Sequence, residues 1–516
     1  MMSDFMSELK KESDLAQDNV SVTENGAIGY KTSGKALLDL NFRLSSMRNM
    51  RDDEIWDEFL QAYNENPVLS LIWMFFARDA REGMGERRTF RVIFKRLCRE
   101  NESAAIKLLT LIPFYGRWDD VVEVFCADVP AKVRDAAFRV INDQLRSDLD
   151  HMTDNKPVSL LAKWLPSENT SSKDTRHRAE MLRNALGWTP KLYRQTLSRL
   201  RHHIDVVEQK MSANEWSEIN YEAVPSRAAM NYRNAFTIHD SERYEQYLTN
   251  VKEGKAKIHA GVLYPYDIVH AYDHPYRMFD DTLEVQWNAL PNTVREGSST
   301  LVVVDGSGSM GCTVGNSSVT CHDVANSIGI YFAEKLTGPY HNQFITFSSS
   351  PKFVSFNGAT SLRSKLDILH KHTECSNTNI EKVFDLVLSV AVKYHLKQDE
   401  IPSNILIISD MEFDAATYQY NYWNKESHKC NAALFDTIKE RWEKAGYQLP
   451  RLVFWNVCSR TGTIPLTTNE LGVALVSGFS PNIADMVLSG SLDPYQCLLD
   501  KLLSGRYLEV EAALRE

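Results

Sequence analysis

The sequence predicts a multidomain protein in which an all-α region of helical repeats precedes an α/β domain with a doubly wound sheet. Up to about residue 290, apolar side chains recur at helical spacing and strand patterns are scarce. Beyond that point, short continuous apolar runs alternate with helical patterns, which is typical of a sheet covered by helices. The chain of 516 residues is also too long for a single hydrophobic core. We therefore expect a helical domain at 35–292 and an α/β domain at 293–516.

The chain is expected to begin with a flexible arm, because residues 1–34 are polar and rich in turn-forming residues. Apolar side chains at positions i, i+3 and i+4 then predict a succession of amphipathic helices. These helical segments are 35–44, 53–63, 68–80, 89–98, 103–113 and 131–145. Only short breaks separate them, so we expect antiparallel helix pairs stacked as an α-solenoid, although no repeat of fixed period is visible.

The second half of the chain contains the predicted strands and the helices between them. The expected strands are 301–304, 342–348, 352–356, 404–409, 451–457 and 472–479. The expected helices are 323–336, 380–388 and 433–442, and another is expected to start at the Ser-Pro pair 480–481. This alternation indicates a parallel sheet with both faces covered.

Composition places the chain among globular proteins, since 43% of its residues are hydrophobic and 24% are charged. No apolar stretch is as long as a membrane span, and the N-terminus lacks the apolar core of a signal peptide. We therefore expect a cytoplasmic protein without membrane contact. The eight cysteines form no CxxC pair, which favours free thiols in a reducing compartment over disulfides or zinc ligands.

Small oxygen-bearing side chains follow the first predicted strand. The strand stops at Asp305, and Ser307 and Ser309 lie in the glycine-spaced loop that comes next. This loop should lie at the carboxyl edge of the sheet, where open α/β sheets bind ligands. One carboxylate and two hydroxyls suit a hard divalent cation such as Mg²⁺. An ordinary turn after a strand is the alternative.

Two further segments carry similar side chains. The strand 404–409 is followed by Asp410, and Thr378 stands just before a helical pattern for which Asn377 or Thr378 is a plausible N-cap. Glu412 and Asp414 follow closely, and we expect them to lie in a solvated loop after the strand.

These residues resemble the metal-ion-dependent adhesion site (MIDAS) of von Willebrand factor A (vWA) domains. Asp305-Gly306-Ser307-Gly308-Ser309 matches the family pattern Asp-x-Ser-x-Ser, with Thr378 and Asp410 at the places of the remote threonine and the second carboxylate. The resemblance implies that Ser307, Ser309 and Thr378 touch the metal through their hydroxyls and that Asp305 and Asp410 act directly or through water. The ion would be Mg²⁺, or Mn²⁺ or Ca²⁺. One coordination position would stay open for an acidic side chain of a protein partner.

The helical half resembles the TROVE family, to which the Ro autoantigen belongs. The similar phrases are 78–88, 112–120, 160–166 and 224–232, and the likeness extends over most of the chain from about 35 onward. It is greatest to an uncharacterised branch that joins such a helical region to a vWA domain. The resemblance implies HEAT-like repeats and a ribonucleoprotein scaffold that binds small noncoding or single-stranded RNA.

Basic residues could support that role locally, although the formal net charge of −10 gives no overall attraction for phosphate. Cations and aromatic residues concentrate between 156 and 201, and a second basic cluster lies beside Gly83 and Gly85. The candidate RNA-binding residues are Lys191, Arg194, Arg199, Arg201, Arg78, Arg81, Arg87 and Arg88. Solvated helix faces, or pairing with Asp79, Glu82 and Glu86, would explain these residues equally well.

The expected function is that of a monomeric, non-catalytic RNA-binding scaffold with a metal-binding vWA domain. The alternative is a metal-dependent protein-interaction adaptor that binds no RNA. The sequence contains no GxxxxGK[ST] nucleotide loop and no GxSxG serine motif. Ser307 stands where a phosphotransferase loop would carry its second aspartate, so we expect no enzyme activity.

Overall fold

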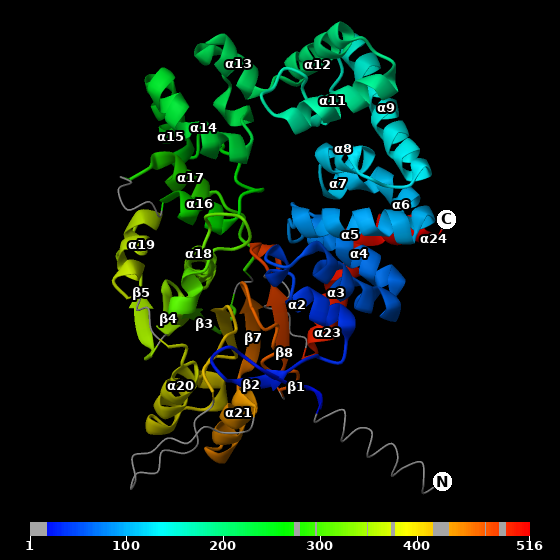
Figure 1. Cartoon of the computed structure of the whole chain (residues 1–516). Helices are drawn as coiled ribbons and strands as arrows, with labels where there is room; N and C mark the ends of the chain where they lie inside the picture. Colours follow the sequence, from blue (N-terminus) through cyan, green and yellow to red (C-terminus); the bar gives the residue numbers. More distant parts are fainter. Residues whose placement is uncertain are drawn as a thin grey trace, which may run out of the picture. The chain divides into compact units, whose positions relative to one another are not determined.

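The computed structural model describes residues 18–272, 279–294, 297–347, 349–372, 377–415, 433–469, 471–483 and 492–515 (Figure 1). The chain forms two compact units. The α/β unit comprises Met1–Arg51, Glu58–Asn66 and Leu263–Leu502, and the helical unit comprises Asp52–Asp57, Pro67–Val262 and Leu503–Glu516. The predicted combination of a helical region with an α/β domain is confirmed. The expected boundary at 292/293 is wrong, because the α/β unit begins again at Leu263 and also includes the N-terminal segment.

The α/β unit contains a six-stranded sheet in the order β5-β4-β3-β6-β7-β8. The strands are β3 (Thr300–Asp305), β4 (Gln343–Phe347), β5 (Lys352–Ser355), β6 (Asn404–Ser409), β7 (Arg451–Asn456) and β8 (Val473–Ser477). Counted from β3, the order is 3-2-1-4-5-6, that of a doubly wound sheet. The sheet is mixed rather than fully parallel, since β5 runs antiparallel to β4. The short turn between them cannot make the crossover that parallel neighbours require.

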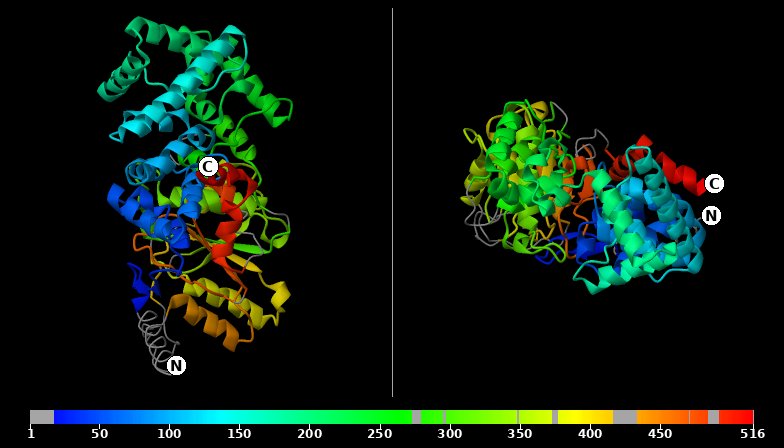
Figure 2. Two further views of the ribbon diagram at one scale, coloured as in Figure 1. Left: turned by 90° about the vertical axis from the view of Figure 1, so that its right-hand side faces the viewer. Right: turned by 90° about the horizontal axis from the view of Figure 1, so that it is seen from above.

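Helices cover both faces of this sheet. The helices of the α/β unit are α2 (Ala36–Phe42), α16 (Pro265–Tyr272), α17 (Asp281–Asn288), α18 (Cys321–Lys335), α19 (Leu362–His370), α20 (Glu381–Lys393), α21 (Leu434–Lys444) and α23 (Pro494–Leu502). Neighbouring side chains of β7 point to opposite faces. Phe454 packs against Phe435 of α21, whereas Trp455 packs against Phe332 of α18, so α18 and α21 lie on opposite faces. Helix α20 lies beside α21 (Figure 1 and Figure 2).

Helices α16 and α17 belong to the α/β unit, although the sequence placed them in the helical domain. Helix α16 packs on α18, and polar contacts attach α17. The Glu284 carboxylate accepts hydrogen bonds from the first backbone N–H groups of α19, at 2.8 Å from Leu362 and 3.0 Å from Arg363. The indole N–H of Trp287 donates to Glu334 of α18 at 2.8 Å. Sequence periodicity reveals a helix but not the surface on which its apolar face packs, so the misassignment has a physical cause.

The N-terminal segment forms a hairpin of β1 (Val20–Val22) and β2 (Ile28–Tyr30), drawn in blue in Figure 1. The expected flexible arm is therefore wrong for residues 18–34, and residues 1–17 lie outside the described part. Backbone hydrogen bonds of 2.9 Å in both directions join Tyr30 to Ile464, and its hydroxyl donates to Asp436. Thr23 and Ala27 are buried in the turn. This polar segment is ordered because its backbone forms hydrogen bonds with the backbone of distant segments.

The helical unit shows no strand within its described residues. Its main helices are α4 (Pro67–Arg78), α5 (Arg87–Glu100), α6 (Glu102–Leu108), α7 (Ile112–Tyr115), α8 (Trp118–Cys126), α9 (Ala131–Thr153), α10 (Leu161–Trp164), α11 (Lys173–Leu186), α12 (Pro190–Ile204), α13 (Val207–Ala213), α14 (Ser226–His239), α15 (Ser241–Lys252) and α24 (Leu508–Arg515). Helix α3 (Asp52–Glu65) has residues in both units. Consecutive helices pack on each other, as α4 does on α5 and α8 on α9, and the C-terminal α24 packs on α4 and α6.

Two sequence-based expectations concern the whole chain. Within the part that the structure describes, no helix is both long enough and apolar enough to cross a membrane. Six of the eight cysteines fall in this part, and they are free thiols. Cys375 and Cys430 lie outside the described residues.

Candidate metal centre at the carboxyl edge of the sheet

The carboxyl ends of β3 and β6 lie side by side. Asp305 is the last residue of β3, and Asp410 directly follows β6. The register pairs Val304 with Ile408, so the two strands end at the same level. These are the first and fourth strands of the doubly wound order. The strands before β6 are added on one side of β3 and the later strands on the other, so the order reverses between β3 and β6. Open α/β sheets bind ligands at this switch point.

Hydrogen bonds organise the loop after β3. The backbone N–H of Ser307 donates to Oδ1 of Asp305 at 2.9 Å, and the hydroxyls of Ser307 and Ser309 are 3.0 Å apart. Gly306 is required here, since a Cβ at this position would lie 2.8 Å from Oγ1 of Thr346 on β4. The loop therefore holds one buried carboxylate and two hydroxyls close together.

Asp410 is fully buried at the start of the loop after β6. Its Oδ1 accepts a hydrogen bond from the N–H of Glu412 at 3.2 Å, and its Oδ2 lies 3.0 Å from Nη1 of Arg460. Met411 adopts a left-handed conformation with φ of 64°, and its N–H donates to Ser409 at 2.9 Å. Such a conformation is strained for a residue other than glycine, so the surrounding contacts must hold this sharp turn in place.

Thr378 reaches this loop from the segment before α20. Its carbonyl accepts the N–H of Asp414 at 3.0 Å, and its hydroxyl accepts a 3.3 Å hydrogen bond from the side chain of Asn25. The predicted helix cap is wrong: the Asn379 side chain, rather than Asn377 or Thr378, accepts a backbone hydrogen bond in the first turn, from Lys382. Thr378 is thereby placed among the residues of the sheet edge instead of capping α20.

Burial disfavours the charged form of both aspartates. Burial and the charge of Asp410 raise the pKa of Asp305, against the lowering effect of the hydrogen bond from Ser409. Burial also raises the pKa of Asp410, although Arg460 and a hydrogen bond from Ser309 act in the opposite direction. Two neighbouring buried carboxylates are costly unless a cation compensates them. Together with the hydroxyls, they form a donor set that fits a hard divalent cation.

No cluster of three or more His, Cys, Asp or Glu side chains suited to a metal occurs in the described ranges. An ion at the sheet edge would accordingly depend on serine and threonine hydroxyls and on water as well as on the two aspartates. Mg²⁺ accepts such a set, because it retains several waters when proteins bind it.

Glu412 is buried, so the expectation of a solvated loop is wrong for this residue. Its Oε1 accepts hydrogen bonds from the N–H groups of Arg460 at 2.8 Å and Thr461 at 3.0 Å, and its Oε2 accepts the N–H of Glu24 at 2.8 Å. Asp414 is only partly exposed and pairs with Gly26 of the hairpin turn. The Glu412 carboxylate is stable in the interior because backbone donors from two distant segments surround it.

Sequence reasoning missed Arg460, Glu24 and Asn25, which also lie at this edge. Arg460 follows β7, so the rule that strand ends converge could have indicated it. The sequence gives no comparable signal for the two hairpin residues.

The structure separates the candidate RNA-binding arginines into buried and exposed ones. Arg78 is buried and its Nη2 lies 2.7 Å from Asp120, so its guanidinium is unavailable to a phosphate. Arg201 donates to the carbonyls of Ala162 and Leu165, at 2.8 Å each, and is likewise occupied inside the unit. The predicted RNA surface is therefore wrong for Arg78 and Arg201, whose guanidinium groups are engaged within the helical unit.

The remaining candidates are more exposed. Arg81 donates to the carbonyl of Phe114, Arg87 lies 3.9 Å from Asp119, Arg88 pairs with Asp52 and Arg194 pairs with Glu168. Lys191 and Arg199 are exposed on α12, and neither has an ion-pair partner among the described residues.

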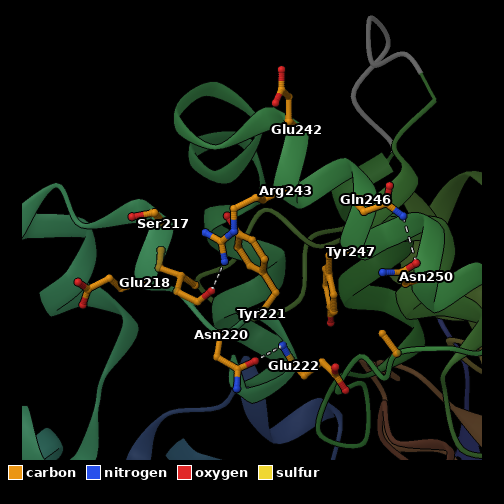
Figure 3. A pocket seen from close by; sticks show the side chains of 12 residues that line it. Ser217, Glu218, Asn220, Tyr221, Glu222, Glu242, Arg243, Gln246, Tyr247 and Asn250 are labelled. Atoms are coloured by element: carbon orange, nitrogen blue, oxygen red, sulfur yellow. Dashed lines mark hydrogen bonds between the residues drawn. The ribbon is translucent and has the colours of Figure 1, made fainter.

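A hollow on the helical unit lies beside α15 and the segment 216–223 (Figure 3). Tyr221 and Tyr247 stack in its wall, with ring centroids 5.4 Å apart. The guanidinium of Arg243 is engaged with the carbonyls of Trp216 and Ile219. Three glutamates line the hollow, namely Glu218, Glu222 and Glu242. This excess of negative charge is unfavourable for a phosphate backbone, so the hollow does not extend the predicted RNA surface.

The fold and the sheet edge define a protein that combines a helical unit with a doubly wound α/β unit carrying an aspartate–hydroxyl site. Residues 168–300 match the family described as "Domain of unknown function (DUF2828)", and residues 299–496 match "Domain of unknown function (DUF7788)". The chain is 30% identical over 522 residues to "Uncharacterized protein L728" of Acanthamoeba polyphaga mimivirus, covering 94% of this chain and 87% of that protein. The chain belongs to the same protein family as L728.

Proposed function

We propose that the α/β unit is a vWA-type domain that binds a divalent cation through Asp305, Ser307, Ser309, Thr378 and Asp410. The observation that carries this proposal is the pair of buried carboxylates at the ends of β3 and β6, with the Ser307 and Ser309 hydroxyls beside them. The strand order supports the resemblance to vWA domains that the Asp305–Ser309 pattern suggests.

The proposed role is reversible binding of a protein partner. A bound Mg²⁺ would supply a Lewis-acidic coordination position for a carboxylate of that partner. The two aspartates would keep the ion in the edge, and the serine and threonine hydroxyls would complete its protein ligands without neutralising its charge. Because carboxylate oxygens are preferred ligands of Mg²⁺, an acidic group is the favoured partner.

Isothermal titration of the full chain with Mn²⁺ tests the metal site. We expect binding by the wild type and loss of at least about tenfold in affinity for Asp305→Asn and for the double variant Ser307→Ala/Ser309→Ala. Asp367→Asn is the matched control, since this carboxylate lies on α19 and pairs with Arg363. Equal affinities for the wild type and Asp305→Asn, with folding retained, would contradict the proposal.

A second candidate function is RNA binding by the helical unit. The observation that favours it is a group of cations on α11 and α12 that are exposed and have no ion-pair partner among the described residues. They are Lys173, Arg176, Lys191 and Arg199. Exposed cations of this kind can neutralise phosphates, and the TROVE resemblance covers the same region.

RNA binding can be tested by filter binding of a single-stranded RNA pool at several salt concentrations. We expect affinity to fall steeply as salt rises, and Lys191→Gln/Arg199→Gln to reduce the slope of log affinity against log salt by about one to two. Arg96→Gln/Arg99→Gln is the control, because these exposed arginines pair with Asp53 and Asp128. Salt-independent or absent binding by the wild type would leave the metal-dependent adaptor as the function.

The cysteines support a location in the reducing cytoplasm. Cys321 and Cys458 are both buried free thiols.

A further inference from the structure

The guanidinium of Arg460 lies between two carboxylates at the sheet edge. Nη1 is 3.0 Å from Oδ2 of Asp410, and Nε is 2.7 Å from Oε2 of Glu24. The Asp410 side chain is completely buried, whereas those of Arg460 and Glu24 are 27% and 50% exposed. A partly exposed cation therefore rests on a buried carboxylate that is also a candidate metal ligand.

The backbones of Arg460 and Glu24 are fixed by the same residue. Oε1 of Glu412 accepts the N–H of Arg460 at 2.8 Å, and Oε2 accepts the N–H of Glu24 at 2.8 Å. The side chain of Asn25 adds a 2.6 Å hydrogen bond to the carbonyl of Glu412. Because these contacts involve backbone groups, the Arg460 side chain can leave Asp410 while its backbone and Glu24 remain in place.

Because of the charges at this position, such a movement of Arg460 would change the affinity of Asp410 for a cation. Arg460 stays protonated, since Asp410 and Glu24 raise its pKa by more than burial lowers it. A divalent cation held by Asp410 would be repelled by a guanidinium on the same carboxylate, and the repulsion is weakly screened because Asp410 is buried. The cation and Arg460 are thus alternative positive partners of one carboxylate.

We propose that Arg460 is a built-in competitor of the divalent cation at Asp410, and that Glu24 retains the guanidinium when the cation takes its place. This inference rests on the proposed metal site and adds a control of its affinity. This competition lowers the affinity of the sheet edge for the divalent cation, so that the site is occupied only at a higher concentration of the ion. Glu24 moderates this effect, because it compensates the arginine charge beside a bound ion.

The proposal predicts opposite effects for the two partners. Arg460→Gln removes the competing charge and should raise Mn²⁺ affinity about tenfold, whereas Arg460→Lys keeps the charge and should leave affinity within about threefold of the wild type. Glu24→Gln leaves Arg460 without its alternative partner and should lower affinity about threefold. Arg43→Gln is the matched control, since Arg43 reaches the carbonyl of Gly462 in the same loop but pairs with Glu58.

Mn²⁺ titration calorimetry on the full chain, with thermal melts to verify folding, measures these affinities. A rise for Arg460→Gln together with a fall for Glu24→Gln supports the proposal. Unchanged or lower affinity for a folded Arg460→Gln overturns it while leaving the metal site intact. If Arg460→Gln does not fold, the test rests on Glu24→Gln, which should fold because the Glu24 side chain is half exposed. An Mn²⁺ affinity of Glu24→Gln that equals or exceeds that of the wild type then overturns the proposal. No Mn²⁺ binding by either the wild type or Arg460→Gln overturns the metal site itself.

Discussion

The hydroxyl of Ser409 donates a 2.5 Å hydrogen bond to Oδ2 of Asp305, from the end of β6 to the end of β3. Both side chains are fully buried. The same hydroxyl accepts the N–H of Met411 at 2.9 Å, so one serine connects the carboxylate to the strained turn. The arrangement links the stability of the sheet edge to the charge state of Asp305.

Ser409→Ala should weaken both metal binding and folding. Without this donor, burial would raise the pKa of Asp305 further, and the turn at Met411 would lose a hydrogen bond. We expect a loss of about 1–3 kcal/mol in the free energy of unfolding and weaker Mn²⁺ binding at pH 7. Urea denaturation and titration calorimetry measure the two effects. Ser389→Ala, an exposed serine on α20, is the control and should change neither.

Metal binding should strengthen as pH rises through about 7, because burial and the charge of Asp410 raise the pKa of Asp305 to about 7. Because the pKa is raised, the protonated carboxyl stabilises the folded state, and this stability is lost as pH rises through the folded pKa. An ion that binds the carboxylate would restore the lost stability. The increase in melting temperature on adding Mg²⁺ should therefore be larger at pH 8 than at pH 6. An increase in melting temperature that is the same at both pH values would contradict the assignment of Asp305 as a metal ligand with a raised pKa.

Gly306→Ala should destabilise the protein through a defined steric conflict. The added Cβ would lie 2.8 Å from Oγ1 of Thr346, which is buried on β4. We expect a loss of about 1–3 kcal/mol in the free energy of unfolding. Thr346→Ala removes the opposing atom, so the double variant should be more stable than the sum of the two single effects. Strict additivity in urea denaturation would show that the conflict lies elsewhere.

Asp120→Ala should strongly destabilise the helical unit. This buried carboxylate lies 2.7 Å from Nη2 of Arg78 and 2.6 Å from Nε of Arg91, and it accepts the N–H of Arg117. Its removal leaves a buried guanidinium unpaired, which costs about 3–5 kcal/mol. The neighbouring Asp119→Ala is the control, because that carboxylate is partly exposed and should contribute less than about 1 kcal/mol. Similar losses for the two variants would refute this explanation.

Local sequence patterns predict those elements whose burial is continuous or periodic. The apolar runs that end at Asp305 and Asp410 became β3 and β6, because parallel strands buried on both faces need such runs. The antiparallel direction of β5 follows from the short turn before it, a constraint that a general expectation of parallel strands overlooks.

The remaining features depend on partners that are distant in the sequence. The hairpin at Val20–Tyr30 is polar, and it is ordered by backbone pairing with Phe413 and Ile464, which composition does not encode. Glu412 is buried because donors from Glu24 and Arg460 meet there. Arg78 resembles a surface cation until its pairing with Asp120 is known, so charge clusters alone cannot identify an RNA surface.

The division of the chain also affects how the protein is made and dissected. Segments of the α/β unit lie on both sides of Pro67–Val262, and Leu503–Glu516 returns to the helical unit. Neither unit is one continuous stretch, so no single cut releases either one whole. During synthesis, the hairpin and α2 emerge long before β8, with which α2 packs, and α4 emerges long before α24, with which it packs. Each unit can therefore be completed only after segments far downstream in the sequence have been made.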